Sequence, residues 1–236
     1  MEKARGEREF EVIRSCSGRT AYLSRLRFDR YKSFMLNVFL GAPVVGILVA
    51  LASVIAEQLL AVIVNVFFQK EIVLDVYHNL SSFLVAAAII EESFKYLSAV
   101  YILRRIFGLK GFIFIFAAVL TGLFFGLTET YFVLLANGRR IQDIGVLGGE
   151  TLFSLGAVLL VHILTAFLIA VLVAVRDRET WFAALRTIVA ATFIHLLFNF
   201  LVVQRGNFTN WLVGIILAVV FVINMSIVAF NFRELD

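Results

Sequence analysis

The sequence predicts an all-α fold, a polytopic transmembrane helix bundle of about six spans with both termini in the cytoplasm. Composition is the first reason. Of the 236 residues, 61% are hydrophobic and 16% are charged, whereas soluble domains are about 45 to 50% apolar. The second reason is that the apolar residues form runs of about 20, the length that crosses a bilayer as a helix. We therefore expect a multi-pass protein of the cell membrane.

Six apolar runs have spanning length. They are residues 34–56, 79–103, 111–136, 150–175, 181–203 and 209–230. The segment 59–68 is apolar but too short to span alone, so it either extends the first helix past Glu57 and Gln58 or forms a re-entrant or interfacial piece. With this segment and the N-terminal arm counted as helices of their own, the chain has seven or eight.

Two charged ends flank the bundle at residues 34–230. The N-terminal arm, residues 1–33, mixes charged and apolar side chains, as amphipathic helices on the inner leaflet do, and residues 231–236 form a short cytoplasmic tail. The arm lacks the apolar core and cleavage site of a signal peptide, so we expect the first span to direct insertion. Cys16, the single cysteine, lies in the arm. A single cysteine cannot form an intrachain disulfide. Its position outside the predicted spans excludes cysteine-protease chemistry inside the membrane.

The lysines and arginines indicate the orientation. With the N-terminus inside, sixteen of them lie on the cytoplasmic side and four, Lys70, Arg139, Arg140 and Arg205, on the other, while Lys95 lies within a span. Cytoplasmic loops carry such an excess of basic residues. The same bias explains the net charge of +4, so we expect no nucleic-acid partner.

Ionisable and strongly polar side chains occur inside four of the spans, at comparable depth. A charged side chain at the centre of a span costs about 2.5 to 3.5 kcal/mol on insertion scales, so such residues are functional candidates. They are Glu91, Glu92 and Lys95 in the second span, Glu129 in the third, His162 in the fourth, and His195 with Asn199 in the fifth. The sequence thus allows them to meet in one cavity.

Helical periodicity shows which of these side chains point the same way. Residues four apart share a helix face, and the pairs are Glu91–Lys95, Phe125–Glu129 and His195–Asn199. Gly122 and Gly126 lie on the side of Glu129, and small residues let helices approach closely. Glu129 is therefore predicted to face the bundle interior.

A purely structural interpretation exists for most of these residues. Glu91 or Glu92 can form an ion pair with Lys95 that lowers the cost of insertion, and each histidine can be a neutral imidazole bonded to a carbonyl. Glu129 has no basic residue one turn away, so its charge must be neutralised across helices. Four charged groups taken singly would cost about 10 to 14 kcal/mol, comparable with the stability of a whole domain. We therefore favour a functional site.

Glutamates and histidines together supply what peptide hydrolysis needs, which is a base for water, donors for the oxyanion and an acid for the departing amine. The sequence has no HExxH zinc motif, no Asp in a predicted span and no GxSxG turn. The spans contain Ser93, Ser98 and Ser154, so a nucleophilic serine is disfavoured rather than ruled out.

Four motifs follow one another on consecutive spans. Residues 91–95 read EExxK, residues 125–129 read FxxxE, His162 is a lone intramembrane histidine, and residues 195–199 read HxxxN. In this order they resemble the PrsW family of intramembrane proteases, which is related to the CAAX prenyl proteases and bacteriocin-processing enzymes. The resemblance covers about residues 81–203.

The resemblance implies a glutamate-dependent mechanism without a covalent acyl-enzyme. The implied roles are Glu91 as the base on water with help from Glu129, Glu92 as an orienting group paired with Lys95, Phe125 as a supporting motif residue, His195 and Asn199 as the oxyanion pocket, and His162 as the group that polarises water or protonates the amine. Glu129 replaces a histidine of the CAAX enzymes, which argues against prenylated substrates. The implied partners are single-pass membrane proteins similar to anti-sigma factors.

No cofactor is expected, because the polar pairs are spread over four helices without compact ligand spacing. Zinc or iron remains open, since two histidines and two carboxylates suit either metal. The ligands would then be Glu91, Glu129, His162 and His195.

Two other functions remain open. A proton-coupled or metal-ion transporter also uses glutamates and histidines within spans, although this set clusters at one depth. A non-catalytic membrane scaffold would need none of these side chains.

Overall fold

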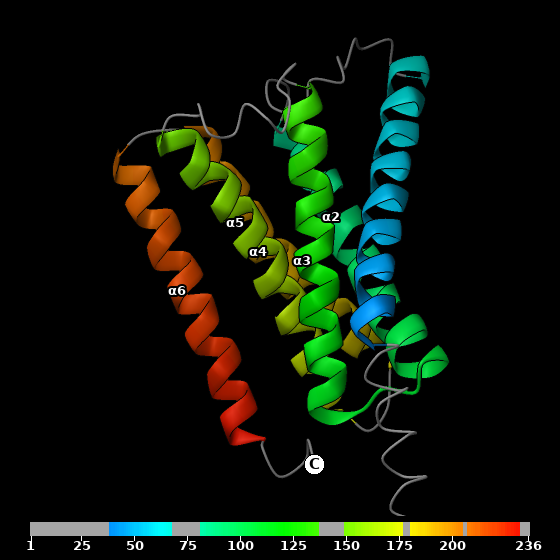
Figure 1. The fold of residues 1–236 in the computed structure, drawn as a ribbon. Coiled ribbons are helices and arrows are strands. Elements are labelled where there is room, and N and C mark those ends of the chain that lie inside the picture. The colour runs from blue at the N-terminus through cyan, green and yellow to red at the C-terminus, as the bar shows by residue number, and fades with distance from the viewer. Residues whose placement is uncertain (1–37, 68–80, 137–148, 177–179, 205–206, 232–236) are drawn as a thin grey trace, which may run out of the picture. The chain divides into compact units, whose positions relative to one another are not determined.

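The computed structural model describes residues 38–67, 81–136, 149–176, 180–204 and 207–231. These residues are helical apart from short turns, and none of them is in a strand (Figure 1). The all-α prediction is confirmed for this part of the chain. The predicted arm at 1–33 and nearly all of the predicted tail at 231–236 lie outside the described residues.

The helices follow the predicted spans closely. They are the helix Val38–Phe67, drawn in blue to cyan in Figure 1, then α2 (Ser81–Leu97), the π-helix η1 (Ser98–Ile106), α3 (Gly111–Ala136), α4 (Gly149–Ala174), α5 (Trp181–Gln204) and α6 (Asn207–Phe230). Five of them, all except α2 and η1, are long and apolar enough to cross a membrane. The remaining predicted span, residues 79–103, corresponds to α2 and η1 together. The number of spans and the side on which the termini lie stay predictions.

The first helix is longer than predicted. The expected end at residue 56 is wrong, because the helix continues through Glu57 and Gln58 to Phe67. Of the alternatives for the segment 59–68, extension of the first helix is therefore confirmed up to Phe67. The physical reason is that Glu57 is 7% exposed and lies on the buried side of the helix, so its charge does not end the span.

A π-helix and a tight turn lead from α2 to α3. π-helical turns are rare and often occur at functional sites, and η1 begins just after the charged part of α2. Gly108 and Gly111 have positive φ angles of 65° and 54°, which glycine adopts without steric cost. The guanidinium of Arg104 donates to the carbonyl oxygens of Val173 and Arg176, so η1 and the end of α4 lie together.

Small residues bring α3 close to both of its neighbours. A Cβ added at Gly122 would lie 2.6 Å from Ala166 Cβ and 2.7 Å from the carbonyl oxygen of His162, both on α4. A Cβ added at Gly46, on the first helix, would lie 2.5 Å from the carbonyl oxygen of Thr121. Only glycine permits backbones to approach this closely. The prediction that Gly122 supports a close helix contact is confirmed.

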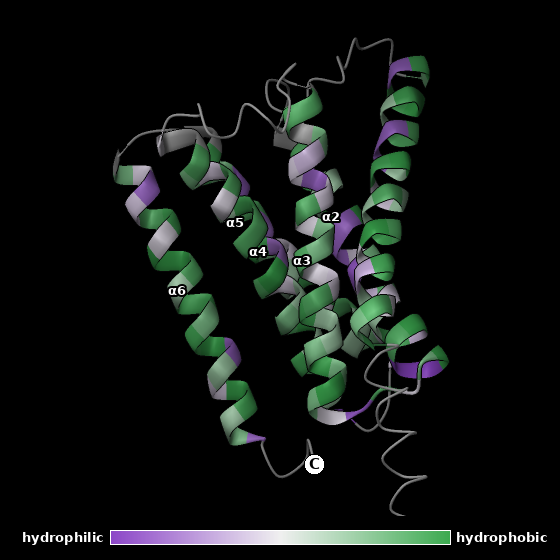
Figure 2. Cartoon of the chain, viewed as in Figure 1, coloured by the Kyte–Doolittle hydropathy of each residue, from purple (hydrophilic) through white to green (hydrophobic). Residues whose placement is uncertain are grey.

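The helices differ in how much protein surrounds them. In the apolar segment of α4, 67% is buried inside the protein, whereas in that of α6 only 22% is buried. Figure 2 shows the outer helices mainly in green, with purple hydrophilic segments on α2 toward the interior. The described polar groups of α2 are thus placed against other helices, which is where a membrane protein can satisfy them.

Candidate functional site

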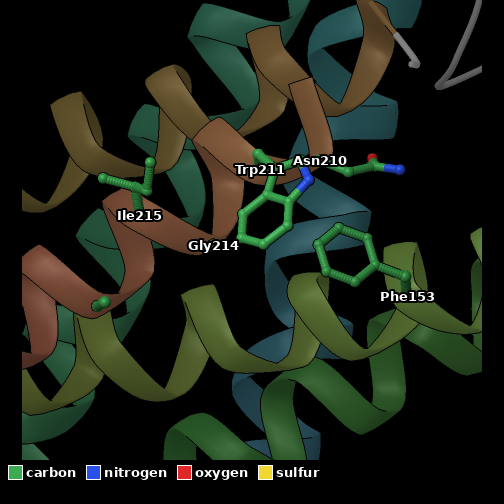
Figure 3. Close-up of a pocket in the computed structure, with 6 residues that line it drawn as sticks. Phe153, Asn210, Trp211, Gly214 and Ile215 are labelled. Carbon is green, nitrogen blue, oxygen red and sulfur yellow. The ribbon is translucent and has the colours of Figure 1, made fainter. Parts of the chain in front are cut away.

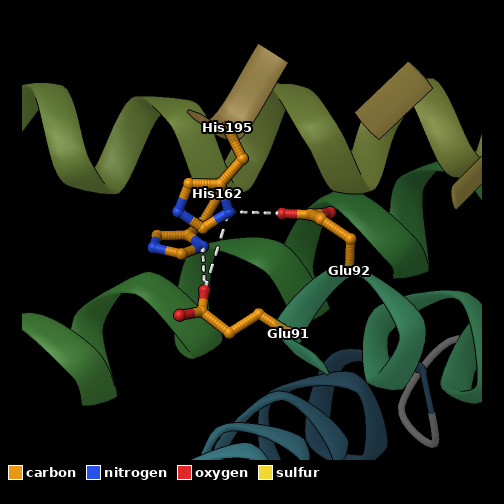
Figure 4. Close-up of side chains that lie close together, drawn as sticks. All are labelled: Glu91, Glu92, His162 and His195. Atoms are coloured by element: carbon orange, nitrogen blue, oxygen red, sulfur yellow. Dashed lines mark hydrogen bonds and ion pairs between the residues drawn. The ribbon is translucent and has the colours of Figure 1, made fainter. Parts of the chain in front are cut away.

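Four ionisable side chains from three helices meet inside the bundle (Figure 4). Glu91 and Glu92 come from α2, His162 from α4 and His195 from α5, and each is at most 7% exposed. One carboxylate oxygen or ring nitrogen from each lies within 4.8 Å of those of the others. The structure thus brings these four of the predicted site residues together.

One carboxylate oxygen of Glu92 contacts three other side chains in and around the cluster. Its Oε1 atom accepts hydrogen bonds from Lys95 Nζ at 2.7 Å and Thr165 Oγ1 at 3.2 Å, and lies 2.7 Å from His195 Nδ1. Because a carboxylate oxygen can only accept, His195 donates from Nδ1. An oxygen with three donors is a poor proton acceptor, so Glu92 orients its neighbours. The predicted pairing of Glu92 with Lys95 is confirmed, and Lys95 pairs with Glu92 rather than with Glu91.

The partners of His162 determine which ring nitrogen carries its proton. Lys95 Nζ lies 2.7 Å from His162 Nδ1, and an ammonium group has donors only, so Nδ1 must be the accepting nitrogen. The proton of the neutral ring is then on Nε2, which contacts Glu129 Oε2. Glu129 therefore has a partner across helices, as predicted, and it fixes the orientation of His162 from the side opposite the cluster.

Glu91, like Glu92 at its Oε2, has one buried oxygen that is not engaged. Glu91 Oε2 is buried and accepts no hydrogen bond from any described residue. It lies 3.8 Å from His162 Nδ1 and 3.7 Å from His195 Nδ1. These distances are too long for direct hydrogen bonds.

Packing around the cluster holds the two histidines in place. The ring of Phe125 lies 4.9 Å from that of His162, and Lys95 Nζ lies 4.6 Å from the centre of the Phe125 ring. The rings of His162 and His195 are perpendicular, with centroids 5.0 Å apart. A Cβ at Gly126 would lie 3.2 Å from His162 Cβ. Phe125 and Gly126 thus shape the wall behind His162.

Asn199 is the predicted site residue that the described contacts do not join to the cluster. It lies one turn after His195 on α5 and is partly buried, and its amide makes no hydrogen bond to a described residue. The proposed role of Asn199 in an oxyanion pocket stays a prediction.

Two buried residues were given no role by the sequence analysis. Thr165 is fully buried and links Lys95 to Glu92 through its hydroxyl group. Its signal was its position three residues after His162, on the same face of α4. Glu57, which was treated as the end of a span, is buried in the first helix. The sequence feature that indicates its burial is the row of small residues, Gly46, Ala50 and Ser53, that precedes it at helical spacing.

The cluster has a donor set that suits a metal ion. Imidazole nitrogens and carboxylate oxygens bind zinc and iron, and ligand atoms around tetrahedral zinc lie about 3.3 Å apart. The four atoms of the cluster, which lie within 4.8 Å of one another, therefore fit such an ion. The sequence predicted that the ligands would be spread over separate helices without compact spacing. This expectation is wrong, because three helices bring the four side chains together.

The identity of the four groups also differs from the expected ligand set. Glu92 belongs to the group and Glu129 does not, because Glu129 contacts the opposite nitrogen of His162. Such a carboxylate commonly orients a metal-binding histidine from behind. Lys95 shares Glu92 Oε1 and His162 Nδ1, so an ion would compete with its ammonium group for both atoms.

A separate hollow of about 540 Å³ lies between α4 and α6 (Figure 3). It is lined by Phe153, Asn210, Trp211, Gly214, Ile215 and Ala218. None of these side chains is ionisable, so this hollow has no groups for acid–base chemistry. The buried cluster is therefore the better candidate for a reactive site.

Comparison with known proteins agrees with the motifs and with this geometry. Searches of curated proteins and of solved structures found no match. The family model described as PrsW family intramembrane metalloprotease matches residues 35–226. This match covers most of the chain and contains all four members of the cluster. The chain therefore belongs to the PrsW family of intramembrane metalloproteases.

Proposed function

We propose that this protein cuts peptide bonds of membrane-anchored proteins by means of a water molecule activated by Glu91. Membership of a family of intramembrane proteases supports peptidase activity. The observation that carries the proposal is the buried Oε2 of Glu91, which has no hydrogen-bond partner among the described residues and faces two histidines. A base needs an available oxygen within reach of water. Glu92 Oε2 is likewise without a partner among the described residues, but the three donors on Glu92 Oε1 stabilise that carboxylate in its charged form and make it the weaker base.

The reaction requires one proton to move twice. Glu91 Oε2 accepts a proton from water as the water oxygen attacks the carbonyl carbon of the substrate. The C–N bond then breaks, and the proton held by Glu91 passes to the departing amine. These two proton transfers complete the hydrolysis without a covalent intermediate. One carboxyl group serves first as the base and then as the acid.

Positive charge and N–H donors surround the same space and suit the oxyanion. Lys95 Nζ lies 2.7 Å from His162 Nδ1, and His195 is held by Glu92. Donors fixed before the reaction stabilise developing negative charge most effectively when water is excluded. The three N–H donors of Lys95 are taken up by Glu92, His162 and Thr165, so Lys95 contributes positive charge near the oxyanion rather than a hydrogen bond to it.

A metal ion would be held by Glu91, Glu92, His162 and His195. When bound, it supplies Lewis-acid activation of water and of the substrate carbonyl. Glu129 would keep His162 in the tautomer that presents Nδ1 to the cluster.

Metal analysis distinguishes the two forms of the proposal. We expect purified protein to contain either about one zinc or iron per chain, with cleavage lost in chelator and restored by that metal, or no metal and chelator-resistant cleavage. His195→Ala should remove bound metal if the first form holds. A metal content unchanged by His195→Ala would show that the ion is not bound at this site.

Substrate trapping tests the proposed activity. The proposed substrates are single-pass membrane proteins similar to anti-sigma factors. Full-length substrate should accumulate with the Glu91→Gln variant and be shortened when wild-type protein is added. A matched control is Ile89→Ala, because Ile89 lies on the same helix and is 46% exposed on the outer surface. Shortening by Glu91→Gln at the wild-type rate would overturn the proposal.

A further inference from the structure

Glu57 lies on the buried stripe of the first helix. The stripe contains Gly46, Ala50, Ser53, Glu57 and Ala61, which repeat every three or four residues. Ala50, Ser53 and Ala61 are at most 1% exposed and Glu57 is 7% exposed. Leu51, Ile55 and Leu59, on other faces of the same helix, are 36% to 60% exposed. Glu57 therefore faces the bundle, not lipid.

The register between the first helix and α3 brings Glu57 toward Glu129. The two helices run in the same direction (Figure 1). The hydroxyl group of Thr121 donates to the carbonyl oxygen of Ala42, and Ala50, two turns further along the first helix, packs with Phe125, one turn further along α3. Glu57 follows further along, and helical side chains tilt toward the N-terminus of their helix. Glu129 lies one turn after Phe125 and Glu57 lies two turns after Ala50, so both carboxyl groups follow this contact along the two helices.

The carboxyl group of Glu57 has no counter-charge among the described residues. Its Oε1 is buried and accepts no hydrogen bond. Lys95, the buried cation of α2, is already engaged with Glu92, His162 and Thr165. A buried carboxylate is costly unless it is paired, so this acidic pair suits a positively charged ligand.

We propose that Glu57 and Glu129 form a subsite for a positively charged side chain, lysine or arginine, next to the bond that is cut. This inference rests on the proposed function. Glu57 forms the buried end of the subsite, whereas the side chain of Glu129 is 24% exposed and so can be reached from outside the bundle. Glu129 and Glu91 approach opposite nitrogens of the His162 ring, so the subsite lies one imidazole ring away from the proposed base and binds a residue close to the reacting carbonyl.

The test uses a series of transmembrane peptides in detergent. Each peptide carries lysine, methionine or glutamate at one position near its cleavage site. For wild-type protein we expect kcat/KM to be about tenfold higher with lysine than with methionine at one position, the size of one hydrogen bond to a charged group. In Glu57→Gln this ratio should fall to about one, through a higher KM for the lysine peptide. Gln58→Leu, on a different face of the same helix, should keep the wild-type ratio.

Three outcomes would overturn the subsite. They are a wild-type protein with no preference for lysine, a Glu57→Gln variant that keeps the preference, and a uniform loss of kcat for all peptides. If Glu57→Gln does not fold, Glu57→Asp replaces it. Because aspartate keeps the charge, it should still favour lysine over methionine, and loss of that preference would also refute the subsite. Peptides cut equally by wild type and Glu91→Gln would instead refute the proposed function.

Discussion

The helices α4 and α6 have the same mean hydropathy, 2.8, over spanning segments of 23 residues, yet 67% of the α4 window is buried and 22% of the α6 window. Hydropathy therefore identifies both as membrane helices but does not tell which one lies at the centre. The reason is that lipid tails are as apolar as leucine, so apolar side chains alone do not drive helices together.

Polar and small residues mark the difference between the two helices. In α4, His162 belongs to the cluster and Thr165 contacts it, and both are fully buried. Ala166 of α4 lies against Gly122 of α3. In α6, Asn224 is the buried polar residue, and its amide donates to the carbonyl oxygen of Leu164 on α4. We infer that α4 positions the site and that α6 supports α4.

The largest effect is expected from the histidine of α4. His162→Ala should lower kcat/KM about a thousandfold, within the range of one acid–base group, because the ring links Lys95 to Glu129. Cleavage of a single-pass substrate by purified protein measures this. Leu160→Ala, on the same helix but 47% exposed, should retain activity. A His162→Ala variant with more than a tenth of wild-type activity would contradict a central role for α4.

Removal of the buried cation should mainly reduce stability. Lys95→Met leaves the carboxylate of Glu92 with one charge partner fewer, and breaking a buried ion pair costs about 3 to 5 kcal/mol. The free energy of unfolding in detergent measures this. The double variant Lys95→Met, Glu92→Gln should lose less than the sum of its single variants, since the two groups are in contact. Additive losses would show that the ion pair contributes nothing.

Glycines sharpen the comparison between the two helices. Gly122→Ala would place a methyl group 2.7 Å from the carbonyl oxygen of His162, so α3 and α4 must separate at a cost of about 1 to 3 kcal/mol. Gly214→Ala, on α6, meets no atom within 4 Å and should change stability by no more than about 0.5 kcal/mol. Thermal unfolding of both variants measures this. Equal losses would mean that the two helices are equally confined.

The smallest effect is expected from the polar residue of α6. Asn224→Ala removes the hydrogen bond to Leu164, and such bonds between membrane helices contribute about 0.6 kcal/mol on average. Unfolding should show this small loss, while kcat stays at its wild-type value because Asn224 has no contact with the cluster among the described residues. A large fall in kcat would place α6 in the site itself.

Sequence patterns by themselves determined the class of fold and most of the site. Runs of apolar residues predicted helices at nearly the observed bounds, and α3 begins and ends where expected, at Gly111 and Ala136. The cost of charge in lipid marked Glu91, Glu92, His162 and His195 before any contact was known. These inferences are possible because backbone hydrogen bonding in a membrane leaves helices as the simplest solution.

Tertiary structure alone decided which carboxylate oxygens of Glu91 and Glu92 accept hydrogen bonds. Glu91 and Glu92 are adjacent and identical in chemistry, and each has a buried Oε2 without a partner among the described residues, but Glu92 Oε1 is held by three donors whereas Glu91 Oε2 faces two histidines. It also brought in Glu57, and it separated Glu129 from the group that fits a metal. Helical periodicity defines a face but not the neighbour on that face. Contacts between α2, α4 and α5 depend on how the helices pack, which no single span encodes.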